Sequence, residues 1–253
     1  MIWDLQKANM SKRISAFLFD FILLCILAVL FAWALSGALG FDGWQRQLDG
    51  AYQRVGEAHG VDLRMKASEY DALDEAGKAA MDAAYAALSA DQQAVKAYAM
   101  IMQLSVLIVT FGVLLGYLVL EFAVPLKLGN GITLGKKIFG LALMQADGVR
   151  IRAPALFIRP VLGKFAIETM IPLIICFMIF WNAIGVVGPA VLLAIALVEG
   201  IVMLATPSRS MIHDLLAKTV VVDFASQMIF ETREDMIHYK EKKHAEMAAK
   251  EQY

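Results

Sequence analysis

Four long apolar stretches constrain this chain more than any other feature. Each is close to the roughly 20 residues that a helix needs to cross a hydrocarbon core of about 30 Å. A hydrophobic fraction of 59% and a mean hydropathy of +0.61 agree with a chain that lies largely in a bilayer. The sequence therefore predicts an all-α polytopic membrane protein with a four-helix transmembrane bundle. The predicted spans are residues 15–40, 99–126, 165–187 and 189–205.

The last two spans form one apolar run, which Trp181-Asn182 and Gly188-Pro189 interrupt. A single helix of that length would be longer than any bilayer is thick. We therefore expect two helices that are joined by a very tight turn.

The charged residues outside the spans predict the orientation. Residues 127–164 hold seven Lys and Arg against one acidic residue, whereas residues 41–98 hold six against ten. Lys and Arg accumulate in cytoplasmic loops. We therefore expect the basic segment and both termini in the cytoplasm and the acidic segment outside. Lys136 and Lys137 are then expected to meet anionic lipid headgroups of the bilayer.

Residues 41–98 predict a helical insertion on the outer face. Aromatic and aliphatic side chains recur at helical spacing up to Gly60, where a helix would end. Ser68 and Asp71 have the spacing of a capping box, which predicts a second helix. The second span is expected to be the inner part of a long helix that begins near Ala90.

Residues 127–164 carry the pattern of a β-hairpin. Residues 138–144 are apolar, Asp147-Gly148 is a strong turn dipeptide, and residues 149–151 resume extended character. The β-branched run 219–222 is available as a third strand, which is physically sensible because a lone hairpin is marginal. The sequence thus predicts a small cytoplasmic β-hairpin or sheet.

The two ends of the chain differ in character. Ile2, Trp3 and Leu5 suggest a short interfacial helix before the first span, and residues 226–253 alternate acids and bases like a charged surface helix. The expected organisation is residues 1–40 for the interfacial helix and first span, 41–98 for the insertion, 99–126 for the second span, 127–164 for the basic loop, 165–206 for the third and fourth spans, and 207–253 for a cytoplasmic strand and charged helix.

Each predicted span carries about one carboxylate, and all 23 Lys and Arg fall outside the spans. A carboxylate in hydrocarbon costs several kcal/mol unless it is protonated, paired or in contact with water. With a rise of about 1.5 Å per residue, all four carboxylates belong to the cytoplasmic half of the bundle. They are Asp20, Glu121, Glu168 and Glu199.

Two interpretations of these carboxylates remain open. In the functional one, they line a polar cavity and exchange protons or bind a small cation, balanced by Arg13, Arg159 or Arg209. In the structural one, each accepts hydrogen bonds from a loop Arg or from Lys136 or Lys164, which fixes the inner loop against the bundle.

We also expect Arg13, Asp20, Arg159, Arg209 and Asp214 to form one coupled polar network. Arg13 and Asp20 are seven residues apart, two turns along one helical face. Arg159 and Arg209 flank the last two spans at one membrane surface, and Asp214 follows Arg209 by five residues. Replacing one member of a buried pair costs roughly 3–5 kcal/mol. Arg13→Ala and Asp20→Ala should each be severe, and the double variant milder than their sum.

No motif for enzymatic chemistry or for a cofactor occurs in the sequence. His213-Asp214 is too small a set for a closed metal site, which needs three or four ligands. A helix cap or a partner for Arg209 is the simpler interpretation. Gly131 to Gly140 is rich in glycine but lacks the spacing of a phosphate-binding loop. We expect no enzymatic activity, no metal, no cofactor and no nucleic-acid partner.

Three separated motifs stand in a characteristic order. They are Arg13-x-x-Ala16-x-x-x-Asp20 in the first span, the run from Gly131 to Leu141 followed by Asp147-Gly148 and Arg159, and Arg209-x-x-x-His213-Asp214-Leu215-Leu216-Ala217-x-Thr219 after the last span. This arrangement resembles the RDD family of bacterial membrane proteins, named for one Arg and two Asp. The resemblance implies Arg13, Asp20 and Asp214 as the naming residues and leaves residues 41–98 as an insertion.

The resemblance also implies a multi-pass protein of the bacterial cytoplasmic membrane, for which ion antiport or other transport is the usual suggestion. We therefore expect an ion or small-solute transporter that uses membrane-embedded carboxylates, with Asp20 as the coupling group. Four helices form a thin wall for a solute path, so this function predicts a homo-oligomer. The alternative is a non-transporting scaffold or assembly subunit, which holds a partner through the outer insertion or the inner sheet.

Overall fold

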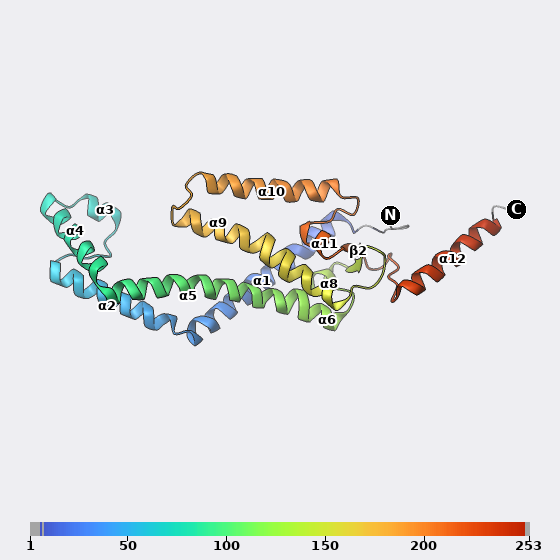
Figure 1. Cartoon of the computed structure of the whole chain (residues 1–253), viewed down its shortest axis with the longest axis horizontal. Coiled ribbons are helices and arrows are strands. Elements are labelled where there is room, and N and C mark those ends of the chain that lie inside the picture. Colours follow the sequence, from blue (N-terminus) through green and yellow to red (C-terminus); the bar gives the residue numbers. More distant parts are fainter. Residues whose placement is uncertain (1–5, 7, 251–253) are drawn as a thin grey trace. The chain divides into compact units, whose positions relative to one another are not determined.

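The computed structural model describes residue 6 and residues 8–250, which are mostly helical (Figure 1). The interfacial helix predicted at Ile2, Trp3 and Leu5 lies outside the described residues. The elements in chain order are α1 Met10–Ala38, α2 Phe41–His59, α3 Ala67–Asp71, α4 Glu75–Ala90, α5 Gln92–Tyr117, the π-helix η1 Leu118–Ala123, α6 Val124–Leu128, α7 Leu134–Ile138, β1 Leu141–Gln145, α8 Ala153–Ile158, the π-helix η2 Arg159–Met170, α9 Ile171–Phe180, α10 Val187–Ala205, α11 Ile212–Leu216, β2 Thr219–Asp223 and α12 Arg233–Lys250.

Among the described residues, four continuous helices are long and apolar enough to cross a membrane. This confirms the predicted all-α polytopic fold. The third helix begins at Ala153, twelve residues before the predicted span, because its first turns carry charged side chains that lower the local hydropathy. The four candidates are Met10–Ala38, Gln92–Leu128, Ala153–Phe180 and Val187–Ala205.

The chain divides into two compact units, one of Met1–Ala28 with Val113–Tyr253 and one of Val29–Gly112. The second unit contains α2, α3 and α4, which pack as a small soluble-type core around Ala51, Met81 and Ala84. These three side chains are fully buried. The insertion is therefore folded and helical, as its periodicity predicts.

The ends of the helices in this unit follow local capping chemistry. Gly60 ends α2 in the left-handed region at φ 65°, as predicted. The capping box predicted at Ser68 is wrong, because the N-cap of α3 is Lys66, two residues earlier. The backbone N–H of Lys66 donates to Glu69 Oε2 at 2.9 Å. Asp74 caps α4 by accepting from the Gly77 N–H at 2.8 Å.

The predicted small sheet forms, and the β-branched run expected as its third strand is the main partner of the first strand. Strands β1 and β2 pair antiparallel from Leu141↔Asp223 to Gln145↔Thr219. Residues 149–151 contribute only isolated bridges, such as Met144↔Arg150. The β-branched run of β2 buries both of its faces, whereas Arg150 is exposed. The run after the fourth span is thus the better partner for β1, because pairing with it removes more apolar surface from water.

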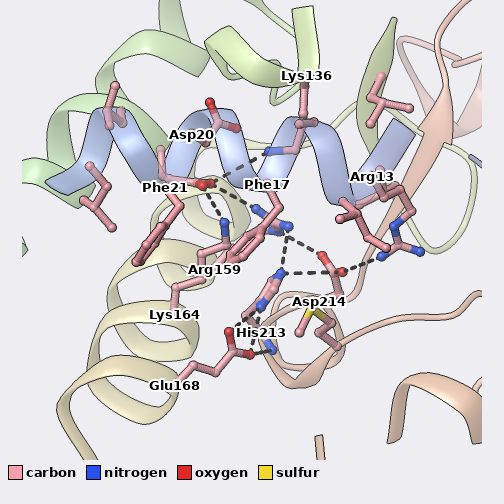
Figure 2. Close-up of a pocket in the computed structure, with 18 of the residues that line it drawn as sticks. Arg13, Phe17, Asp20, Phe21, Lys136, Arg159, Lys164, Glu168, His213 and Asp214 are labelled. Carbon is pink, nitrogen blue, oxygen red and sulfur yellow. Dashed lines mark hydrogen bonds and ion pairs between the residues drawn. The ribbon is translucent and has the colours of Figure 1, made fainter. Parts of the chain in front are cut away.

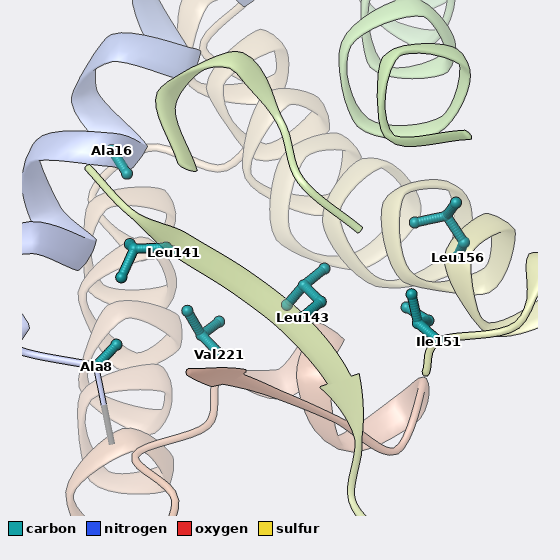
Figure 3. Packing of buried hydrophobic residues seen from close by; sticks show 7 residues of the cluster. All are labelled: Ala8, Ala16, Leu141, Leu143, Ile151, Leu156 and Val221. Carbon is teal, nitrogen blue, oxygen red and sulfur yellow. The ribbon is translucent and has the colours of Figure 1, made fainter. Parts of the chain in front are cut away.

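One apolar cluster joins the sheet to the membrane helices (Figure 3). Leu141 and Leu143 of β1 and Val221 of β2 pack with Ala16 of α1 and Leu156 of α8. The start of the first span and the start of the third span are therefore held against the same sheet. This arrangement brings the charged ends of several membrane helices together.

Candidate functional site

Asp20 of α1 is held by the inner loop. Its Oδ2 accepts the hydroxyl hydrogen of Thr133 at 2.5 Å, and its Oδ1 accepts the backbone N–H of Gly135 at 2.8 Å. Thr133 is also the N-cap of α7. A Cβ at Gly135 would meet the carbonyl oxygen of Ala16 and the carboxyl group of Asp20. The glycine therefore allows the loop backbone to approach α1 closely enough to bind this carboxylate.

Glu121 in η1 is surrounded by three cations. Arg159 Nη1 lies 3.2 Å from Oε2 and Lys136 Nζ lies 3.9 Å from it, while Lys164 Nζ contacts Oε1. Arg159 and Lys164 are five residues apart in η2. A π-helix, with its i→i+5 bonds, places such residues on one face, whereas an α-helix would turn them apart. The unusual winding of η2 thus directs both cations at one carboxylate.

Arg159 connects Glu121 to Asp214 of α11. Its Nε donates to Asp214 Oδ1 at 2.9 Å, and Thr219 Oγ1 donates to the same oxygen at 3.1 Å. The two side chains are 3% and 1% exposed, so this ion pair is almost completely dehydrated. Burial raises the pKa of Asp214, but the charge of Arg159 outweighs it and holds that pKa well below its usual range.

His213 links the same arginine to Glu168. Its Nδ1 lies 2.7 Å from Glu168 Oε2 and 2.8 Å from Oε1, and its backbone N–H also donates to Oε1. Arg159 Nη2 lies 2.9 Å from His213 Nε2. A Cβ at Gly163 would collide with the His213 side chain, so η2 needs glycine there for α11 to pack against it.

These side chains line a cavity of about 320 Å³ in the unit that contains both sheet strands (Figure 2). The cavity wall carries all four carboxylates of the cluster, namely Asp20, Glu121, Glu168 and Asp214. Arg13 also lines the cavity, and most of the remaining wall is apolar, including Phe17 and Phe21. Burial lowers the pKa of Lys136 to about 8, although the charge of Glu121 opposes this shift. Within the described part of the chain, no group of three or more His, Cys, Asp or Glu could hold a metal ion.

The family model of the RDD family matches residues 7–218. The chain belongs to the RDD family. The matched segment contains the polar side chains that line the cavity, from Arg13 to Asp214. Thr219 directly follows the last matched residue. No curated protein and no solved structure matches the chain.

The structure places the three residues expected to give the RDD family its name around one cavity, but with partners that differ from the prediction. Arg13 Nη1 donates to the carbonyl oxygen of Arg209 at 2.7 Å, and its Nη2 lies 3.8 Å from Asp214 Oδ2. Asp20 binds the inner loop instead. Among the described residues, Arg13 and Asp20 form no ion pair. The predicted direct coupling of these two residues is therefore wrong.

Three further residues of the predicted site differ from expectation in this RDD protein. The side chain of Arg209 is exposed, and only its carbonyl group enters the cluster. Glu199 is half-buried in α10 and forms no hydrogen bond or ion pair with any described residue. Asp214 pairs with Arg159 rather than with Arg209. Lys136 was expected either at the lipid headgroups or as the partner of a carboxylate. It is buried beside Glu121, as the structural interpretation predicts, and Lys137 remains exposed.

Sequence reasoning did not identify His213 and Thr133 as members of the site. Both lie in the motifs that carry the RDD resemblance. Thr133 stands between two apolar residues, and His213 forms a polar pair with Asp214 in an otherwise apolar run. That combination is the available signal, because a buried polar side chain is almost always hydrogen-bonded.

Proposed function

We propose that this RDD protein carries protons, in exchange or together with another small solute, through a path that includes the cavity. One observation supports this function best. Two of the four cavity carboxylates, Asp20 and Glu168, are held by a hydroxyl, backbone N–H groups and an imidazole rather than by Lys or Arg. A carboxylate without a direct cationic partner takes up a proton at a lower cost than one in an ion pair. Intramembrane carboxylates of this kind mark ion and proton paths.

Flux measurements in proteoliposomes test this function. Vesicles containing the wild-type protein should show proton movement when a Na⁺ or K⁺ gradient is applied, and Asp20→Asn should abolish it. Asp49→Asn, which changes an exposed carboxylate of the insertion, is the matched control and should leave the flux unchanged. Absence of flux from the wild-type protein under both gradients would refute the proposal.

The orientation belongs to the same proposal. The basic residues of the inner loop support a bacterial cytoplasmic membrane protein with both termini and the sheet in the cytoplasm. In a variant without Cys25 and Cys176, Glu75→Cys should react with an impermeant thiol reagent from outside, and Asp147→Cys only from inside. Modification of both positions from one side would show that the orientation is wrong.

Oligomerisation is a further part of the proposal, because four membrane helices form a thin wall around a solute path. A native mass or crosslinking measurement in the bilayer should give a multiple of the 27.8 kDa chain. The anionic lipid headgroups expected as partners would then meet the exposed Lys137.

A scaffold function is the alternative, and a different observation favours it. Glu121 and Asp214 are locked in ion pairs that fix the inner loop, η2 and α11 to one another. A scaffold predicts that Asp20→Asn changes stability while wild-type vesicles carry no proton flux. The flux experiment therefore separates the two functions.

A further inference from the structure

We propose that His213 is a further proton-carrying residue of the cavity beside Asp20, and that a proton on its Nε2 moves that nitrogen's hydrogen bond from Arg159 to Asp214. The inference rests on the proposed transport function, because it names a second group that accepts the transported proton. Two observations support it, namely the hydrogen bonds around the imidazole and the buried Asp214 Oδ2, which lacks a hydrogen-bond partner among the described residues.

The two neighbours of the imidazole define its tautomer. A guanidinium has only donors, so Arg159 Nη2, at 2.9 Å, requires Nε2 to be an unprotonated acceptor. Glu168 is an acceptor when ionised, so its oxygens at 2.7 and 2.8 Å require a hydrogen on Nδ1. His213 is therefore neutral in this arrangement, with its lone pair on the side of Arg159.

Asp214 Oδ2 is the buried side-chain atom that lacks a hydrogen-bond partner in the described part of the chain. His213 Nε2 lies 3.6 Å from it, just beyond hydrogen-bond distance. Arg13 Nη2 lies 3.8 Å away and is retained there by the bond of Nη1 to the Arg209 carbonyl oxygen. A buried acceptor without a partner costs about 1–3 kcal/mol. A hydrogen on Nε2 would satisfy it after a small movement of the ring.

The change of hydrogen-bond partner at His213 Nε2 needs one proton from water and no other reactant. A proton from water in the cavity bonds to the lone pair of Nε2, and the imidazole gains one positive charge. Arg159 cannot give up a hydrogen, so two N–H groups then face each other and their contact breaks. The new N–H turns to Asp214 Oδ2, while Nδ1–H stays on Glu168. Arg159 keeps Asp214 Oδ1 and Glu121 Oε2, and its Nη2 becomes a free donor beside the cavity.

The charges around His213 come from every element packed against it. Glu168, Arg159 and Lys164 lie on η2, Asp214 lies on α11, Arg13 faces Asp214 from α1, and Glu199 is the charged residue of α10. Burial lowers the pKa of His213, and the charge of Asp214 opposes this shift. The neutral form is thus the resting form near pH 7, and the protonated form arises on the acidic side.

Nitrogen NMR of the whole protein in lipid nanodiscs tests the inference. The chain has four histidines, so ¹⁵N-histidine labelling gives few signals, and His213→Gln identifies those of His213. Near pH 7.5 His213 should show one bare and one protonated nitrogen, with the hydrogen on Nδ1. As the pH falls below 6, the bare-nitrogen signal should disappear. A His213 that keeps its bare nitrogen down to pH 4, or that carries its hydrogen on Nε2 at pH 7.5, would overturn the inference.

Asp214→Asn tests the acceptor. An amide whose oxygen stays on Arg159 presents its NH₂ group to Nε2, which stabilises the bare nitrogen and opposes its protonation. The midpoint of the His213 titration should therefore move to lower pH, whereas Asp147→Asn, in the exposed turn after β1, should not move it. An unchanged midpoint in Asp214→Asn would refute the role of Asp214. If that variant does not fold, the ¹³C signal of the Asp214 carboxyl group in the wild-type protein provides the second measurement, because it should shift as His213 titrates. A carboxyl signal that does not follow the His213 titration would refute the role of Asp214.

The NMR titration does not depend on flux. Protonation of His213 in a protein without proton flux would overturn the transport function alone. Flux in a protein whose His213 stays neutral throughout would overturn this inference alone.

Discussion

The helical insertion and the polar site both contain ion pairs, but the two regions bury them differently. In the insertion, Arg64 and Asp49 form a pair whose side chains are 55% and 52% exposed. In the site, the side chains of the Arg159–Asp214 pair are 3% and 1% exposed. Water already solvates the first pair, so its net contribution is small. The second pair has lost that water, and each charge depends on its partner. Similar residue types thus have different energetic roles.

The largest expected effect is that of Arg159→Met. The variant leaves Asp214 and Glu121 buried without their common partner, which should lower the free energy of unfolding by about 3–5 kcal/mol. Chemical unfolding in detergent measures this loss. The double variant with Arg159→Met and Asp214→Leu should lose less unfolding free energy than the two single variants lose together. A loss below about 1 kcal/mol in the single variant would show that the site is solvated like the insertion.

Asp20→Ala should have the next largest effect. It leaves the Thr133 hydroxyl and the Gly135 N–H without an acceptor, at a cost of about 1–3 kcal/mol. Glu199→Ala is the matched control, because this carboxylate also lies in a membrane helix but has no such partners among the described residues. Its unfolding free energy should stay within about 0.5 kcal/mol of wild type. Equal losses in both variants would contradict the difference in pairing.

Lys136 should make the stability depend on pH. Its folded pKa of about 8 lies below the ordinary value of 10.5, so the unfolded chain binds more protons between these values and stability should rise with pH. Lys136→Met should reduce this rise, whereas Lys137→Met, at an exposed neighbouring position, should preserve it. Melting temperatures measured from pH 7.5 to 10.5 check this. The same slope in Lys136→Met and wild type would show that the ammonium group is not buried.

Arg64→Ala should have the smallest effect. Exposed pairs contribute about 0.2–1 kcal/mol, and salt screens them. The loss of unfolding free energy should therefore be below about 1 kcal/mol and should shrink further at 1 M salt. A larger loss, or one that salt does not change, would remove the contrast between the insertion and the site.

Properties that depend on a short stretch of chain follow from the sequence. The number of spans and the helical insertion come from hydrophobic length and periodicity, and the end of α2 comes from Gly60. The carboxylates of the spans are visible because a charge stands out against apolar neighbours. The β-branched run of β2 also shows its strand character by itself. In each case the physical cause acts within one or two turns of the residue concerned.

The tertiary structure alone decided which of these groups meet. Thr133 reaches Asp20 across 113 residues, and Arg159 reaches Asp214 across 55. The sequence instead favoured partners that were close along the chain for the two aspartates, namely Arg13 for Asp20 and Arg209 for Asp214. Those predictions failed because a buried charge takes the partner that the packing of helices and loops brings to it. The π-helical winding of η2, which aims Arg159 and Lys164 at Glu121, is a product of that packing.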